Sequence, residues 1–95
     1  MIGARGTTAQ VAMASANTEY SYTFPVGTCR FTMKLEVVGS EFNVAFKENE
    51  SGADEFITIP IGSSYEEIDI KMSAATIYFQ SPGTSQVMHI KSWIR

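Results

Sequence analysis

Ninety-five residues with a mass of 10.4 kDa suffice for one compact domain and leave no material for a second hydrophobic core. Apolar residues form 44% of the chain and charged residues 18%, a balance that argues against an intrinsically disordered protein. The net charge of −3 arises without the basic stripe that is typical of nucleic-acid binding. A mean hydropathy of −0.02 predicts no membrane span, so we expect neither nucleic acid nor membrane as a partner.

Few residues are available for catalysis, since the chain holds one cysteine and one histidine. Cys29 has no partner for an intramolecular disulfide, and its place in an alternating apolar run predicts a small buried thiol. His89 lies between Met88 and Ile90, and no nucleophile-elbow sequence accompanies it. Zinc requires four ligands, of which these two residues supply at most two. We therefore predict a protein that is not an enzyme and that binds no cofactor.

Residues 1–18 differ in character from the rest of the chain. They contain one charged residue, Arg5, and no aromatic residue, so little in them would anchor the segment in a core. We predict an N-terminal arm or tail over 1–18 and a single β-sandwich domain over 19–95. In an assembly, the arm would become ordered against a neighbouring subunit. A weak alternation at 10–14 also allows a short edge strand.

From residue 19 onward apolar and polar residues alternate, which is the pattern of half-buried β-strands. The first predicted strand covers 20–24 and ends at a proline-glycine turn. The second covers 28–38, and residues 42–46 continue the alternation after a tight turn, as in a hairpin. The face of the second strand that we expect in the core carries Cys29, Phe31, Met33, Leu35 and Val37.

The remaining strands are shorter. Residues 56–61 alternate, but Pro60 cannot donate to a sheet ladder, so this strand belongs at a sheet edge or ends there. Residues 76–80 and 86–94 form the last two predicted strands, separated by a strong turn signal.

Residues 64–72 allow two interpretations. The spacing of Ser64 and Glu67 is that of a helix capping box. The apolar residues that follow, Ile68, Ile70 and Met72, recur every second position and lack helical spacing. We predict a strand.

About seven short strands without a convincing helix predict an all-β fold, an antiparallel β-sandwich or jelly-roll-like domain with an extended N-terminal arm. A core of this size gains from neighbours, so we expect a homo-oligomer. Aromatic side chains dominate the cores of protein interfaces, so outward-facing aromatics are candidates for such a contact. Equally, the opposite sheet of the same chain could cover these aromatic side chains. The interface candidates are Arg5, Val11, Met13, Phe56, Tyr78 and Trp93.

One acidic loop carries ligand types that suit calcium, namely Glu48, Glu50, Asp54 and Glu55. The EF-hand order of ligands is absent, and a solvated hairpin loop explains the same residues. We therefore predict no metal site and keep this loop as the weaker alternative.

Four segments carry a resemblance to a known class of proteins: residues 22–28 (YTFPVGT), 56–65 (FITIPIGSSY), 76–81 (TIYFQS) and 90–93 (IKSW). Together they resemble small β-rich virion proteins of tailed bacteriophages, over roughly residues 20–95. The resemblance implies a structural protein of the virion, made in the host cytoplasm, that is a head decoration or cement protein or else a head-fibre or tail component. Its implied partners are further copies of itself, as a dimer or trimer, and the major capsid protein or other virion proteins. No functional residue is carried over.

Two functions follow as expectations. The first is a non-enzymatic capsid decoration protein that bridges coat subunits and so stabilises the head. The alternative is a carbohydrate- or receptor-binding β-module of a phage tail or cell-surface protein, which would use Tyr65, Tyr78 or Trp93 as stacking platforms.

Overall fold

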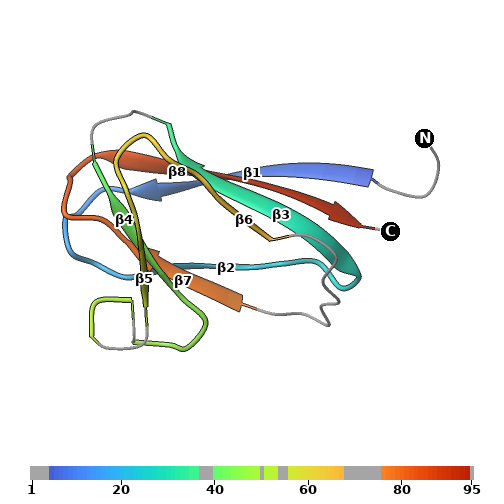
Figure 1. The fold of residues 1–95 in the computed structure, drawn as a ribbon, viewed down its shortest axis with the longest axis horizontal. Helices are drawn as coiled ribbons and strands as arrows, with labels where there is room; N and C mark the ends of the chain where they lie inside the picture. The colour runs from blue at the N-terminus through green and yellow to red at the C-terminus, as the bar shows by residue number, and fades with distance from the viewer. Residues whose placement is uncertain (1–4, 37–39, 50, 54–55, 68–75, 95) are drawn as a thin grey trace.

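The computed structural model describes residues 5–36, 40–49, 51–53, 56–67 and 76–94 (Figure 1). Within these ranges the chain forms strands and turns, and no helix is long and apolar enough to cross a membrane. The strands are β1 (Arg5–Met13), β2 (Tyr20–Thr23), β3 (Thr28–Leu35), β4 (Phe42–Ala45), β5 (Ile57–Ile59), β6 (Tyr65–Glu67), β7 (Thr76–Gln80) and β8 (Gln86–Ile94).

Two four-stranded antiparallel sheets form the sandwich (Figure 1). One sheet has the order β1-β8-β3-β6 and the other has the order β2-β7-β4-β5. The chain pairs β1 with β8, β2 with β7, β3 with β6 and β4 with β5, like one long hairpin. Pairing of β3 with β8 and of β4 with β7 wraps this hairpin around itself. This arrangement is the jelly roll, which confirms the predicted fold class.

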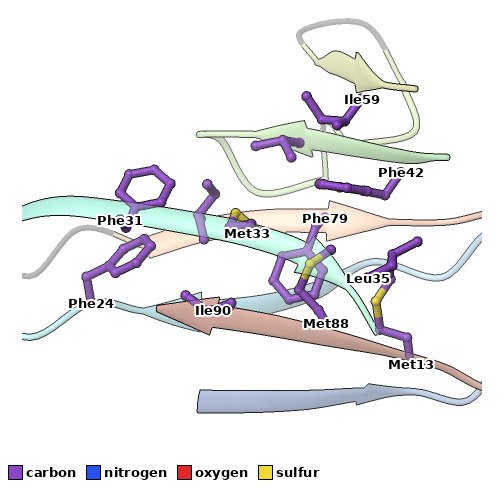
Figure 2. Packing of buried hydrophobic residues seen from close by; sticks show 12 residues of the cluster. Met13, Phe24, Phe31, Met33, Leu35, Phe42, Ile59, Phe79, Met88 and Ile90 are labelled. Carbon is purple, nitrogen blue, oxygen red and sulfur yellow. The ribbon is translucent and has the colours of Figure 1, made fainter. Parts of the chain in front are cut away.

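The inner faces of both sheets supply the core, as the alternation predicts (Figure 2). Phe31, Met33 and Leu35 of β3 point inward, and Phe24 lies against Phe31 with ring centroids 4.5 Å apart. The twelve residues of the buried cluster are Met13, Phe24, Phe31, Met33, Leu35, Phe42, Val44, Ile59, Ile77, Phe79, Met88 and Ile90.

The predicted position of Cys29 in the core is wrong, because β3 contains an irregularity that the alternation does not reveal. The pairing of β3 with β8 shifts register between Thr28 and Arg30, so Cys29 is an extra residue in the strand. Thr28 is fully buried in its place, and its hydroxyl donates a 2.7 Å hydrogen bond to the carbonyl of Pro25. Cys29 is half-buried, with its thiol 3.5 Å from the carbonyl oxygen of Trp93.

The N-terminal segment differs from the predicted arm. Residues 5–13 form a strand that pairs with β8 along its whole length, from Arg5 opposite Ile94 to Met13 opposite Gln86. Met13 is only 1% exposed and belongs to the core. The edge strand that the alternation at 10–14 allowed therefore exists, but it begins five residues earlier and ends at Met13. A pairing between the two ends of the chain leaves no local signal in the sequence, which explains the difference.

The other strand predictions are confirmed where the structure describes them. Residues 65–67 form a strand, as predicted in preference to a helix, and the rest of that predicted strand lies outside the described residues. The strand predicted over 56–61 is shorter than expected, because β5 ends at Ile59 immediately before Pro60. Of its apolar residues, Ile59 is buried, whereas Ile57 and Ile61 are exposed.

Candidate functional site

The two residues with catalytic potential occupy ordinary structural positions. His89 lies on the outer face of β8, where its Nε2 is 2.8 Å from a carboxylate oxygen of Glu36. Cys29 lies near the other end of the same sheet and has only the Trp93 carbonyl as a hydrogen-bond partner in the described part of the chain. The two side chains therefore do not form a nucleophile–base pair.

Most acidic residues of the loop considered for calcium lie outside the described part of the chain. Glu48 is exposed, and Glu50, Asp54 and Glu55 lie outside the described residues. Within the described ranges, no three His, Cys, Asp or Glu side chains come together as a metal site. The predicted absence of a metal site and the weaker calcium alternative both stay untested.

A pocket of about 510 Å³ opens on the side of the sandwich where β1 and β2 are the edge strands. Its lining comes from β1, the start of β2, β7 and the loop after β4. Its lining residues are Val11, Glu19, Tyr20, Ser21, Glu48, Asn49 and Tyr78. The structure thus brings together Val11 and Tyr78, two of the interface candidates, and Glu48 of the acidic loop.

Glu19 holds the loop after β4 against the start of β2. Its carboxylate accepts hydrogen bonds from the backbone N–H of Asn49 at 2.7 Å and from the N–H and hydroxyl of Ser51 at 3.1 and 2.5 Å. Ser51 is fully buried. Burial disfavours the charged form of Glu19, but the hydrogen bonds from Ser51 and Asn49 outweigh it and lower the pKa of this carboxyl. Sequence reasoning did not identify Glu19, because its partners lie about thirty positions away.

The six interface candidates have different positions in the structure. Val11 and Tyr78 are half-buried at the pocket, and Phe56 is 37% exposed just before β5. Met13 as an interface residue is a wrong prediction, since it is buried in the core of its own chain. The backbone of Arg5 belongs to β1, whereas its side chain is outside what the structure describes.

Trp93, the sixth candidate, is packed against neighbours of its own sheet. The guanidinium carbon of Arg30 lies 4.5 Å from the centre of the indole ring, and the Lys91 ammonium lies 5.5 Å away. A Cβ placed at Gly6 would lie 3.3 Å from the indole nitrogen, so the glycine makes room for the ring. The cations of its own chain already occupy positions over the Trp93 ring, which makes this ring a poor stacking platform for a ligand.

Four large apolar side chains are exposed around the short edge strand β5, and we call them the β5 patch. Phe46 follows β4 directly and is 50% exposed, and the centroid of its ring lies 6.5 Å from that of Tyr65. The others are Phe56, Ile57 and Ile61, which are 37%, 50% and 60% exposed. Of these four, the sequence analysis identified only Phe56 as an interface residue. Ile57 and Ile61 lie in and just after β5, an edge strand of three residues.

Comparison with models of known protein families gives no match, and neither does comparison with characterised proteins. Two solved structures are similar in fold. One is a de novo designed double-stranded β-helix, with 16% identity and a TM-score of 0.51 over 94% of this chain and 97% of that chain. The other is a chain from Bacillus endospore appendages, which form a family of disulfide-linked pili, with 13% identity and a TM-score of 0.51 over 97% of this chain and 88% of that chain. At these identities the similarity shows the fold alone.

Proposed function

We propose that this chain is a non-enzymatic structural subunit of a phage particle, and that it docks onto another virion protein through the β5 patch. The observation that carries the proposal is the exposure of Phe46, Phe56, Ile57 and Ile61 around one short strand. Contiguous exposed apolar patches mark protein interaction sites, and we infer that these side chains contribute to one. The phage setting comes from the sequence resemblance described above.

The physical role of such a subunit is to add contacts between neighbouring coat subunits. Covering the β5 patch removes apolar surface from water, at about 25 cal/mol per Å². Many copies bound across joints of a shell would together oppose its expansion and disassembly. The similarity in fold to a chain from pilus-forming endospore appendages adds one supporting point, because a sandwich of this kind is compatible with a repeated place in an assembly.

The test measures binding of the purified protein to purified phage shells and the thermal stability of those shells. We expect the protein to bind shells and to raise the temperature at which they disassemble. The double variant Ile57→Thr/Ile61→Thr should bind at least tenfold more weakly. Val26→Thr is the matched control, since Val26 is 68% exposed in the β2–β3 turn, away from the patch. Shells that neither bind the protein nor gain stability from it would overturn the proposal, as would equal losses in the patch variant and the control.

The pocket favours a second candidate function, the binding of a carbohydrate. Tyr20 and Tyr78 offer aromatic rings at the pocket, and Glu19, Glu48 and Asn49 offer hydrogen-bonding groups. Screening on a glycan array would test this function. A glycan that binds the wild-type protein should lose binding in Tyr78→Ala and keep it in Trp93→Ala, because Trp93 does not line the pocket. An array without binding would exclude this candidate.

A further inference from the structure

The sandwich has four edge strands, and three of them carry features that prevent pairing with another chain. β2 has four residues and is followed closely by Pro25, whereas β5 has three and is followed by Pro60. β6 is described over Tyr65–Glu67, and two of these three residues are glutamates. Short strands, prolines and charges are the usual means by which proteins protect the edges of their sheets.

β1 lacks these protections after its first residue, Arg5. It has nine residues, and its segment 6–13 contains neither a charged residue nor a proline. Its pairing with β8 runs through nine consecutive residue pairs without a bulge. On the opposite side of β1, alternate backbone N–H and C=O groups have no neighbouring strand in the described part of the chain. Such a long, regular, uncharged edge is a template for strand addition.

The inner face of β1 is also incompletely covered. The register with β8 places Thr7, Ala9 and Val11 on the core side, opposite Ser92, Ile90 and Met88. Thr7 is exposed, and Ala9 and Val11 are only half-buried, although their three partners on β8 are buried. The reason is that β2, the edge strand of the facing sheet, has only four residues. A further strand beside β1 would cover these side chains.

We propose that β1 pairs antiparallel with β1 of a second copy of this chain, which joins two four-stranded sheets into one sheet of eight strands. The second copy is the occupant because strand length must match: the other described edges offer three or four residues, and only another β1 offers nine. A two-fold axis through the centre of β1 makes the contact self-complementary. It also places residues of the same face opposite each other. With the axis at Ala9, Thr8 faces Gln10 and Thr7 faces Val11, so segment 6–12 opposes no charges.

Thr8 and Gln10 provide the test, because both are exposed and lie on the outer face of β1. The double variant Thr8→Lys/Gln10→Lys leaves the core untouched but places four lysines along the seam of the dimer. The control Ser63→Lys/Ser64→Lys makes the same charge change at an exposed turn before β6. Sedimentation equilibrium over a range of concentrations gives the mass of each protein, and circular dichroism verifies that each one is folded.

We expect the measured mass of the wild-type and control proteins to rise with concentration, from the 10.4 kDa of the monomer toward twice that value. The β1 double variant should remain monomeric or dimerise at least tenfold more weakly. Amide hydrogen exchange gives an independent reading: alternate amides of β1 should become protected only when the wild-type protein is dimeric. A wild-type protein that stays monomeric at millimolar concentration would overturn the proposal, and so would a dimer that persists in the β1 variant. Neither result depends on shell binding, so this proposal and the proposed function can fail separately.

Discussion

The substitution Met13→Ala tests whether the N-terminal segment is a docked strand or a mobile tail. Met13 is 1% exposed and belongs to the same buried cluster as Leu35 and Met88 (Figure 2). Truncation of a buried methionine to alanine costs about 2–5 kcal/mol, the sum of lost transfer free energy and the cavity that remains. We expect ~3 kcal/mol here, since Met13 lies at the end of an edge strand, where the site can partly collapse. In a domain of this length that loss corresponds to a fall in Tm of about 12 °C.

Urea unfolding followed by circular dichroism measures this loss. The experiment is done at low protein concentration, so that association through β1 does not add to the free energy of unfolding. Met33→Ala is the reference for a fully buried methionine in a central strand and should cost at least as much. Gln10→Ala is the control on the exposed face of β1 and should change the free energy of unfolding by less than about 0.5 kcal/mol.

The refuting result is a Met13→Ala protein as stable as Gln10→Ala. In that case residues 1–18 would behave as the tail that their composition suggests, and β1 would not be docked on β8. An intermediate loss together with fast hydrogen exchange in β1 would also contradict a firmly docked strand, because local opening limits what a substitution there can cost.

Three further predictions concern polar groups of the sandwich. Glu19→Gln should lower the free energy of unfolding by about 1–2 kcal/mol in urea denaturation, because the buried N–H and hydroxyl of Ser51 lose a charged acceptor. Glu41→Gln, at an exposed position, is the control. The pKa of Glu19 is lowered on folding from its usual 4.5, so its stabilisation is complete above about pH 5 and is lost as the pH falls through the lower pKa of the folded protein. Stability measured from pH 7 to pH 3 should therefore fall less in Glu19→Gln than in the wild type. Ser92→Ala should leave the Tm unchanged or raise it, because the buried Ser92 hydroxyl lacks a hydrogen-bond partner among the described residues.

Much of the fold was predictable because alternation is a local signal. In β3 and β8 the inward residues are those that the period of two selects, apart from Cys29 and the polar Ser92. The bulge at Cys29 was not predictable from alternation, because an extra residue is recognised only from the register with the partner strand. The same holds for β1, since its composition suits a tail and only the pairing with β8 makes it a strand.

The candidate sites were less predictable than the fold. Alternation predicted strands at 42–46 and 56–61 but could not show that Phe46 and Ile57 are each 50% exposed. The pocket joins residues from β1, β2, β7 and the loop after β4, which come together only through the wrapping of the jelly roll. In the sequence, Glu19 is one of ten acidic residues and nothing distinguishes it. Its structural role depends on hydrogen bonds from Asn49 and Ser51, which the sequence does not reveal.

The topology also explains why β1 would be weakly held within one chain and yet associate readily with a second copy. The two ends of the chain meet in the β1–β8 pair, so this pair closes a loop of more than seventy residues, at a high cost in chain entropy. β8 is already held on its other side by β3, whereas among the described strands β1 pairs with β8 alone and is otherwise held by side chains such as Met13. Docking of β1 therefore completes the sheet late and gains comparatively little inside a single chain. A second β1 on its free edge would bind only the docked form, and by mass action this would stabilise the strand in each copy. The element that composition marks as a tail is, on this reasoning, the one whose order would depend most on assembly.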